Sequence, residues 1–303
     1  MTGRNAPAAR FHHDTIRHQL NLHPLMMSGR IITGSQGAFT MELYKGLITI
    51  IMPAYNESGH IYNNLAEAHS FFRRSKCRFE IIVVDDGSED DTYKESLRAS
   101  KDLEGIKVVH YPFNNGKGNA LKEGFGHAAG DYVVFLDSDL DLHPSQLCGL
   151  FRIMRDEQAQ VVVGSKSHAL SKLNYPAGRK ALSKVYAFVL RLMFGLPLRD
   201  TQTGLKVFKK EVLDRVFPRV LCKRYAFDVE LLANAHRAGY KVVEAPVVLN
   251  YRRQMRWGRI GFKDVYRMAM DTLAIYYRMH ILRYYDQYAD EGEAVDRGYG
   301  WTC

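Results

Sequence analysis

The sequence has few cysteines and no long apolar run, and each shortage removes a class of protein. Its four cysteines are scattered widely over 303 residues, which excludes a zinc-binding pair and a dense disulfide framework and favours reduced thiols in a cytosolic protein. No window holds the roughly 18 to 20 apolar residues that a membrane-spanning helix needs. Residues 1–49 also lack the uninterrupted apolar core of a signal peptide. We therefore expect a chain that does not span a bilayer.

The residues that are present describe a large folded chain with excess positive charge. Hydrophobic residues make up 46% of it, enough for a large core, which excludes disorder for most of the chain. Lys and Arg number 42 against 33 Asp and Glu, a formal net charge of +9. This balance indicates an anionic partner: nucleic acid, an anionic lipid surface or a phosphorylated substrate. Residues 1–44 carry irregularly spaced histidines, and we predict a flexible leader there rather than a metal site.

Four short apolar runs separated by helical segments predict a parallel sheet. Each run has the length of a buried strand, and they cover residues 47–52, 79–84, 106–111 and 131–136. The intervening segments predict helices at residues 57–74, from Ser88 onward and at 117–129. Strands about 30 residues apart with helices between them imply right-handed crossovers and an α/β fold. Ligands of such sheets bind outside the carboxyl ends of the strands.

Polar and acidic residues follow three of these strands. They are Pro53-Ala-Tyr-Asn-Glu57, Asp85-Asp-Gly-Ser88 and Asp137-Ser-Asp-Leu-Asp141. In an extended segment the three alternating aspartates of the last group would all point the same way. Crowded carboxylates are costly without a cation, and oxygen ligands suit Mg²⁺ or Mn²⁺. A solvated acidic loop is the alternative interpretation, whereas an EF-hand is excluded by its missing Gly and Glu.

A glycine-rich turn opens the helix predicted at residue 117. The segment Asn114-Asn-Gly-Lys-Gly-Asn-Ala120 offers backbone N–H groups, and Lys117 could approach a phosphate or a ribose. It lacks the ending of a Walker loop and the spacing of a dinucleotide fingerprint. The turn alone is weak evidence for a nucleotide site.

Together these motifs resemble the family 2 glycosyltransferases, and most closely the branch that makes polyprenyl-phosphate sugars such as dolichyl-phosphate mannose and glucose. The resemblance runs from about residue 47 to 260 and includes Asp200-Thr-Gln-Thr-Gly-Leu-Lys206, which looks like the glucosyltransferase version. It implies a GT-A fold, with a mixed, mainly parallel Rossmann-like α/β sheet flanked by helices. It also implies an NDP-sugar donor, UDP-glucose or GDP-mannose, and a Mg²⁺ or Mn²⁺ cofactor.

The resemblance assigns roles to individual residues. Asp139 would bind the metal with Asp141, which stands where the mannose synthases often have Gln, and Lys166 replaces an Arg that contacts phosphates. Arg179 and Ser183 match positions that receive the lipid phosphate, so that Asp139, Lys166, Arg179 and Ser183 form the implied catalytic set. The residues implied to hold the nucleotide sugar are Pro53, Tyr55, Glu57, Val84, Asp86, Lys117, Asp137, Ser138, Asp139, Lys166 and Arg252.

Three further residues, Thr203, Asp228 and Glu230, are candidates for the donor-sugar site. The two acids lie where members with a sugar acceptor keep a catalytic base, so they could serve as a base, bind the donor sugar or brace arginines. A lipid phosphate acceptor is already anionic and needs no base. In-line attack by it would invert the anomeric centre.

The helix predicted at residues 180–195 is amphipathic. Lys180, Lys184 and Arg191 share one face, and the other carries Leu182, Val185, Tyr186, Val189 and Met193. Such a helix can lie in a membrane interface with its apolar face in the lipid, although packing on the sheet is the alternative. A basic, aromatic stretch follows at residues 252–267, for which anionic headgroups are the simpler partner than nucleic acid. A last helix is predicted at about 261–288.

These features divide the chain into three parts. We predict a leader at 1–44, a GT-A catalytic domain at 45–250 that contains the interface helix 180–195, and a basic loop with a helical extension at 251–303. The leading hypothesis is an inverting, metal-dependent hexosyltransferase that acts on polyprenyl (dolichyl or undecaprenyl) phosphate, peripheral at the cytoplasmic face of the membrane. The alternatives are transfer to a saccharide or glycolipid hydroxyl, and a basic nucleic-acid-binding protein. Homo-oligomerisation or a membrane partner protein is left open.

Overall fold

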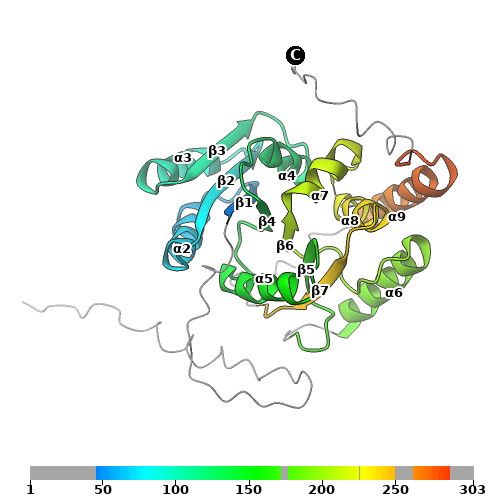
Figure 1. The fold of residues 1–303 in the computed structure, drawn as a ribbon. Helices are drawn as coiled ribbons and strands as arrows, with labels where there is room; N and C mark the ends of the chain where they lie inside the picture. The colour runs from blue at the N-terminus through cyan, green and yellow to red at the C-terminus, as the bar shows by residue number, and fades with distance from the viewer. Residues whose placement is uncertain (1–45, 172–176, 225, 250–261, 287–303) are drawn as a thin grey trace, which may run out of the picture. The chain divides into compact units, whose positions relative to one another are not determined.

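The computed structural model describes residues 46–171, 177–224, 226–249 and 262–286, and of residues 177–184 and 262–265 it describes the backbone alone. The predicted leader at 1–44 and Arg252 therefore lie outside the described residues, as does most of the basic loop. Figure 1 shows the central sheet and the helices around it.

The sheet contains seven strands, and the four predicted from the sequence are among them. Their interiors are apolar and buried, as expected for strands covered on both faces. The strands are β1 (Leu47–Ala54), β2 (Arg78–Asp86), β3 (Ile106–Tyr111), β4 (Tyr132–Leu136), β5 (Val161–Ser165), β6 (Leu205–Lys209) and β7 (Val242–Pro246).

The strand order is β3-β2-β1-β4-β6-β5-β7, and β6 alone runs against its neighbours. All other pairings are parallel. Because β6 is reversed, the chain enters it at the edge where the other strands end. The segment before β6 therefore lies beside the carboxyl ends of β4 and β5, which is where a ligand site is expected.

Helices cover both faces of the sheet. The core on one face contains Ile51, Phe135 and Phe208 with apolar residues from α4, α6, α7, α8 and α9, and the core on the other contains Ile50, Val134 and residues from α2, α3 and α5. The helices are α2 (Ile61–Arg74), α3 (Thr92–Asp102), α4 (Lys117–Gly126), α5 (Leu147–Asp156), α6 (Ala177–Phe194), α7 (Lys210–Val216), α8 (Phe227–Arg237) and α9 (Phe262–Tyr276). Short helical turns lie at Pro144–Gln146, Phe217–Arg219 and, as a π-helix, Tyr277–Ile281.

Several helices are shorter than the sequence predicted; α3 begins at Thr92 instead of Ser88, and the last predicted helix ends as α9 at Tyr276 and continues as a π-helix to Ile281. The helix α2 begins at Ile61 instead of residue 57, because His60 has a φ of −136°, outside the helical range. The helix α4 ends at Gly126 instead of residue 129. The N–H of Ala129 donates to Glu80 Oε1 at 2.7 Å rather than continuing the helix.

The helices α6 and α9 pack against each other. The Tyr186 hydroxyl lies 3.0 Å from the Thr272 hydroxyl, and His280 Nε2 lies 3.0 Å from the Met193 carbonyl oxygen. Figure 1 shows the two helices side by side, with α6 in green and α9 in orange. Within the described parts of the chain, no helix is both long enough and apolar enough to cross a membrane.

Candidate active site at the carboxyl edge of the sheet

The acidic motif after β4 forms a tight turn. Leu140 takes a left-handed conformation with φ 52°, and its N–H donates to the Asp137 carbonyl oxygen at 3.2 Å. The prediction of an extended segment with three aligned aspartates is therefore wrong. The Asp141 N–H donates to Asp139 Oδ1 at 3.1 Å, so these two residues remain neighbours. A left-handed leucine is a strained conformation of the kind that clusters at functional sites.

A complete protein cage for a metal is absent from the described residues, among which no three potential metal-ligating side chains of His, Cys, Asp or Glu gather. Mg²⁺ and Mn²⁺ sites that act on nucleotides commonly use one or two carboxylates, with substrate phosphates and water as the other ligands. Asp139 and Asp141 are both half-buried at the site edge. These two carboxylates fit a cation whose remaining ligands would come from phosphate groups and water.

Asp137 forms an ion pair with Lys117 from the glycine-rich turn. The two side chains are 39% and 41% exposed. Desolvation opposes the charge of each, but their attraction outweighs it and moves the pKa of Asp137 below its ordinary value and that of Lys117 above. The ammonium groups of Lys206 and Lys166 also lower the pKa of Asp137. Both groups are therefore charged at neutral pH.

The segment before β6 connects the ends of β4 and β5. The Asp200 carboxylate accepts hydrogen bonds from the Lys166 N–H at 3.0 Å and the Thr203 hydroxyl at 2.7 Å. Leu205 pairs with Leu136 in the antiparallel register, which places Gly204 beside Asp137. A Cβ atom on Gly204 would lie only 1.8 Å from Asp137 Oδ2. Because Gly204 has no side chain, the Asp137 carboxylate can occupy the space that a Cβ atom would fill.

The acids Asp228 and Glu230 lie on the first turn of α8 and have different surroundings. Asp228 Oδ1 accepts a hydrogen bond from the buried Lys206 ammonium at 2.8 Å. Glu230 is fully buried and accepts hydrogen bonds from the N–H groups of Leu221 and Cys222, at 2.9 and 2.6 Å. The sequence left three roles open for Glu230: a base, a ligand of the donor sugar or a structural brace. Its burial and hydrogen bonds match the brace.

Two side chains from the C-terminal end of the described chain also bind Glu230. Arg278 of the π-helix donates to Glu230 Oε1 at 2.9 Å, and the Tyr285 hydroxyl donates to the same oxygen. Burial, followed by the Glu230 charge, raises the pKa of Tyr285. The loop that Glu230 holds continues to Lys223, whose carbonyl oxygen accepts the Gly118 N–H at 2.9 Å. Glu230 thereby joins the C-terminal helix to the beginning of α4.

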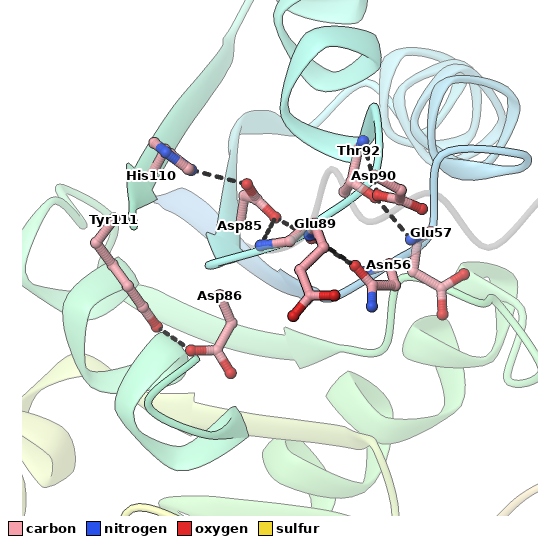
Figure 2. Close-up of polar contacts among 10 residues, drawn as sticks. Asn56, Glu57, Asp85, Asp86, Glu89, Asp90, Thr92, His110 and Tyr111 are labelled. Carbon is pink, nitrogen blue, oxygen red and sulfur yellow. Dashed lines mark hydrogen bonds and ion pairs between the residues drawn. The ribbon is translucent and has the colours of Figure 1, made fainter. Parts of the chain in front are cut away.

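The loops after β1 and β2 are connected by hydrogen bonds, as Figure 2 shows. The Glu89 N–H donates to Asn56 Oδ1 at 2.9 Å, and the Asn56 N–H donates to Ser88 Oγ at 2.9 Å. Buried Asp85 accepts hydrogen bonds from the Ser88 hydroxyl and from His110 Nδ1, the latter at 2.8 Å. These contacts fix the two loops that carry the predicted nucleotide residues.

Asp86 binds the glycine-rich turn. Its carboxylate accepts hydrogen bonds from the Tyr111 hydroxyl at 2.7 Å, from the Asn115 N–H at 2.8 Å and from the Gly116 N–H at 2.9 Å. Figure 2 shows the contact with Tyr111, whose pKa is raised by burial and by this hydrogen bond. Gly116 has a φ of 96°, a conformation that glycine adopts readily. Asp86 therefore positions the turn that presents Lys117.

A cleft of about 430 Å³ opens beside this turn. It is lined by Asn114, Asn115, Leu221, Cys222, Lys223, Arg224, Asp271 and Arg278. Three of these residues are cationic and one is acidic. The cleft adds to the positive charge next to the predicted nucleotide site.

The remaining predicted residues differ in accessibility. Tyr55 is 42% exposed and Pro53 and Glu57 are half-buried at the end of β1, whereas Val84 is fully buried in the core and cannot offer its side chain to a ligand. Ser138 is buried, and its carbonyl oxygen accepts a hydrogen bond from Asn64 at 2.7 Å. Arg179 and Ser183 lie in the first part of α6, residues 177–184, of which the structure describes the backbone alone.

Asp200 and Lys206 hold this site together, although the sequence indicated them only as the two ends of a motif and assigned neither a role. The signal for Lys206 is a charge inside an otherwise apolar strand, Leu-Lys-Val-Phe. Its significance depends on the reversed direction of β6, which the residue pattern alone did not give.

Comparison with known proteins identifies the class. Residues 49–217 match the family described as glycosyl transferase family 2, and the chain belongs to that family. The protein is therefore a glycosyltransferase, which leaves the non-enzymatic nucleic-acid hypothesis without support.

Its curated relatives include enzymes that act on dolichyl phosphate. The chain is 30% identical over 221 residues to dolichyl-phosphate beta-glucosyltransferase of Saccharomyces cerevisiae, a match that covers 66% of each protein. It is 31% identical over 203 residues to glycosyltransferase AglD of Haloferax volcanii, covering 66% of this chain and 32% of that protein. The matched region thus spans just under two thirds of the yeast protein and about a third of the archaeal one.

Solved structures show the same fold at low sequence identity. Glucosyl-3-phosphoglycerate synthase from Mycobacterium tuberculosis, in complex with Mn²⁺, UDP-glucose and phosphoglyceric acid, superimposes with a TM-score of 0.57. The sequences are 21% identical, and the match covers 77% of this chain and 79% of that one. A further structure of that enzyme, with Mg²⁺ and UDP, gives a TM-score of 0.57 at 22% identity. The chain has the GT-A fold that the sequence predicted.

Proposed function

We propose that the protein is an inverting, metal-dependent hexosyltransferase that moves glucose or mannose from an NDP-sugar to polyprenyl phosphate at the cytoplasmic face of a membrane. UDP-glucose is the favoured donor, because the Asp200–Lys206 motif resembles the glucosyltransferase version and the yeast relative carries that name. The predicted three-part division of the chain, with its catalytic domain at 45–250, belongs to the same proposal.

The observation that carries the lipid acceptor is the exposed apolar row on α6. Val185, Phe188, Val189 and Leu192 are 60%, 68%, 38% and 78% exposed. They recur at helical spacing on one face, and an exposed apolar stripe of this kind marks an interaction surface. The same helix begins with the predicted acceptor residues Arg179 and Ser183. A lipid phosphate bound there would have its hydrocarbon chain beside an apolar surface.

The exposed apolar row on α6 contains other residues than the sequence predicted. Tyr186 and Met193 were expected on the lipid face but pack against the core, while Phe188 and Leu192 take their places outside. On α9, Tyr266, Met270 and Leu273 are also exposed, at 67%, 47% and 54%, and Tyr277 at the start of the π-helix that follows is 52% exposed. Because α6 and α9 pack together, we infer that both contribute to the membrane-facing surface.

The state of the two candidate bases also favours a phosphate acceptor. Asp228 is paired with the Lys206 ammonium, and Glu230 is enclosed by four hydrogen-bond donors. These contacts occupy both oxygens of Glu230 and one oxygen of Asp228, and they hold the two carboxylates in structural roles. Polyprenyl phosphate is anionic without a base. It needs cations that align it opposite the leaving group, a task for which Arg179 and Lys166 are the candidates.

Residues at the carboxyl edge of the sheet would bind the NDP-sugar donor. Lys117 and the glycine-rich turn would approach the donor phosphates, and Asp137 would face the ribose and diphosphate. A divalent cation held by Asp139 and Asp141 would offset the charge that develops on the leaving diphosphate. Displacement from the opposite side by the lipid phosphate would invert the anomeric centre.

Transfer of radiolabel is the test of this proposal. Purified protein is incubated with UDP-glucose or GDP-mannose labelled in the sugar, a short polyprenyl phosphate, and Mg²⁺ or Mn²⁺. We expect label in the organic phase from one donor, and at least a 100-fold loss with EDTA, because one charge-stabilising group at the reacting centre is typically worth about that much. Asp139→Asn is expected to reproduce the loss with metal present.

The controls separate the proposal from its alternative. Adding Mn²⁺ back to the EDTA-treated enzyme should restore transfer. Slow hydrolysis of the NDP-sugar without labelled lipid would preserve the donor site but reject the acceptor. Label transferred to a saccharide or glycolipid hydroxyl instead would support the alternative acceptor class.

Charge placed on the α6 row should remove membrane binding. We expect Phe188→Asp with Leu192→Asp to weaken co-sedimentation with anionic phospholipid vesicles at least about 10-fold, since burying one such side chain is worth roughly 1.5 to 3 kcal/mol. Transfer to a short, water-soluble polyprenyl phosphate should persist, because neither residue is assigned to the active site. The control for added charge is Asn63→Asp. Asn63 is exposed on α2, a helix that covers the opposite face of the sheet from α6. Unchanged sedimentation of the double variant would reject this surface.

A further inference from the structure

Lys206 is a buried cation in the middle of the apolar sheet. The residue is 1% exposed, while its neighbours on β6, Leu205 and Val207, are fully buried. Its ammonium group donates to the Thr203 carbonyl oxygen at 2.5 Å and to Asp228 Oδ1 at 2.8 Å. A buried charge is costly unless it is paired, and an apolar residue of similar volume often serves stability as well. The position of Lys206 therefore calls for a reason other than packing.

Asp228, which Lys206 holds, has one oxygen left over. Among the described residues its hydrogen bond and ion pair are with Lys206 alone, and both use Oδ1. The side chain is 11% exposed, so the carboxylate is not sealed in the core. It lies on the first turn of α8 and close enough to Lys117 to raise the pKa of that lysine. Oδ2 is thus an acceptor held near the groups predicted to bind the donor.

The place of this pair is fixed by the segment that precedes β6. Thr203 is held by Asp200, which also binds the N–H of Lys166, and Gly204 lies against the carboxylate of Asp137. The pair accordingly sits between the ends of β4 and β5. The donor diphosphate is expected at the first of these ends and the acceptor phosphate near the second. The group that must lie between the two phosphates is the hexose.

We propose that Asp228 recognises hydroxyl groups of the donor hexose and that Lys206 is the positioning residue that holds it for this task. A hydroxyl would donate to Asp228 Oδ2, while Oδ1 stays bound to the Lys206 ammonium. Hydrogen bonds to a charged acceptor are stronger than neutral ones, and a site built to receive a hydroxyl rejects ligands that lack it. This inference rests on the proposed function, since it requires an NDP-hexose in the site.

The test compares two ligands that differ only in the hexose. Calorimetry with Mn²⁺ gives the affinities of UDP and UDP-glucose (or of GDP and GDP-mannose) for the wild type, Lys206→Met and Asp228→Asn. In both variants we expect the affinity for the bare nucleotide to change less than about 2-fold. The extra affinity for the nucleotide sugar should fall about 10-fold or more, the range of a charge-assisted hydrogen bond. The kcat should fall with it.

Two further variants decide between positioning and general stability. Lys209→Met removes a half-buried lysine from the other end of the same strand and should leave the hexose contribution unchanged. In the Asp228→Asn background, Lys206→Met should add little further loss of hexose affinity, because Lys206 acts through Asp228. If Lys206→Met does not fold, Asp228→Asn alone must still lose the hexose contribution.

The outcomes separate this inference from the proposed function. A wild type that binds neither nucleotide nor nucleotide sugar would reject the proposed function itself. A wild type that prefers the nucleotide sugar, with folded variants that keep the same preference, would overturn the role of Lys206 and Asp228 alone. Equal losses for nucleotide and nucleotide sugar would assign the pair to the general stability of the site and would also overturn the inference.

Discussion

Gly204→Ala is expected to lower kcat/KM for sugar transfer by about 100-fold while the protein stays folded. The new Cβ would occupy the position of Asp137 Oδ2, at 1.8 Å, so that carboxylate must move and its ion pair with Lys117 must change. A displacement of about 1 Å in a reacting constellation can cost about 100-fold. The clashing atoms belong to a side chain rather than to the backbone, so the strand itself can remain in place. The measurement is steady-state transfer alongside thermal unfolding.

Gly149→Ala is the matched control. Gly149 lies inside α5, and a Cβ there would meet nothing within 4 Å. Activity should be unchanged, and stability should rise by up to about 1 kcal/mol, because alanine is the better helix former. Wild-type turnover in Gly204→Ala would show that the position of Asp137 is not required.

Glu230→Ala is expected to cause the largest loss of stability, about 3 to 5 kcal/mol. The substitution removes the partner of Arg278 and leaves two N–H groups and the Tyr285 hydroxyl without their acceptor. Breaking a buried ion pair on one side costs this much because the other charge remains uncompensated. For a domain of this size the melting temperature should fall by about 10 °C.

The control for this prediction is Glu211→Ala, which removes an exposed glutamate from α7. Its effect should stay within about 0.5 kcal/mol. Glu230→Gln keeps the shape of the side chain and should fall between the two. If the melting temperature of Glu230→Ala stayed within about 2 °C of the wild type, the loss of stability would be no more than about 1 kcal/mol, and the bracing role would be contradicted.

The sequence predicted the first half of the fold well because its signals are local. Apolar runs as short as those at residues 47–52 and 131–136 favour strands buried on both faces, and the polar and acidic residues that follow them then lie at the strand ends. The reversal of β6 could not be obtained this way. It depends on pairings between residues far apart in the sequence, such as Leu136 with Leu205, and no local pattern records the direction of a strand.

The amphipathic helix shows a second limit. Its apolar arc is wide, and periodicity does not say which part of that arc faces the sheet. Tyr186 is turned inward by its hydrogen bond to Thr272 on α9, which leaves Phe188 outside. The roles of Asp228 and Glu230 stayed open for the same reason, since their partners Lys206 and Arg278 come from distant segments.

The position of β6 has a consequence for synthesis of the chain. Both strands that flank it, β4 and β5, are translated earlier, and β6 inserts between them in the opposite direction. Until residues 205–209 leave the ribosome, β4 has one unpaired edge, and β5, whose other neighbour β7 follows later still, is unpaired on both sides. Such edges are templates for pairing with other chains. We therefore expect the nascent protein to be most prone to aggregation before its last third supplies β6 and then β7.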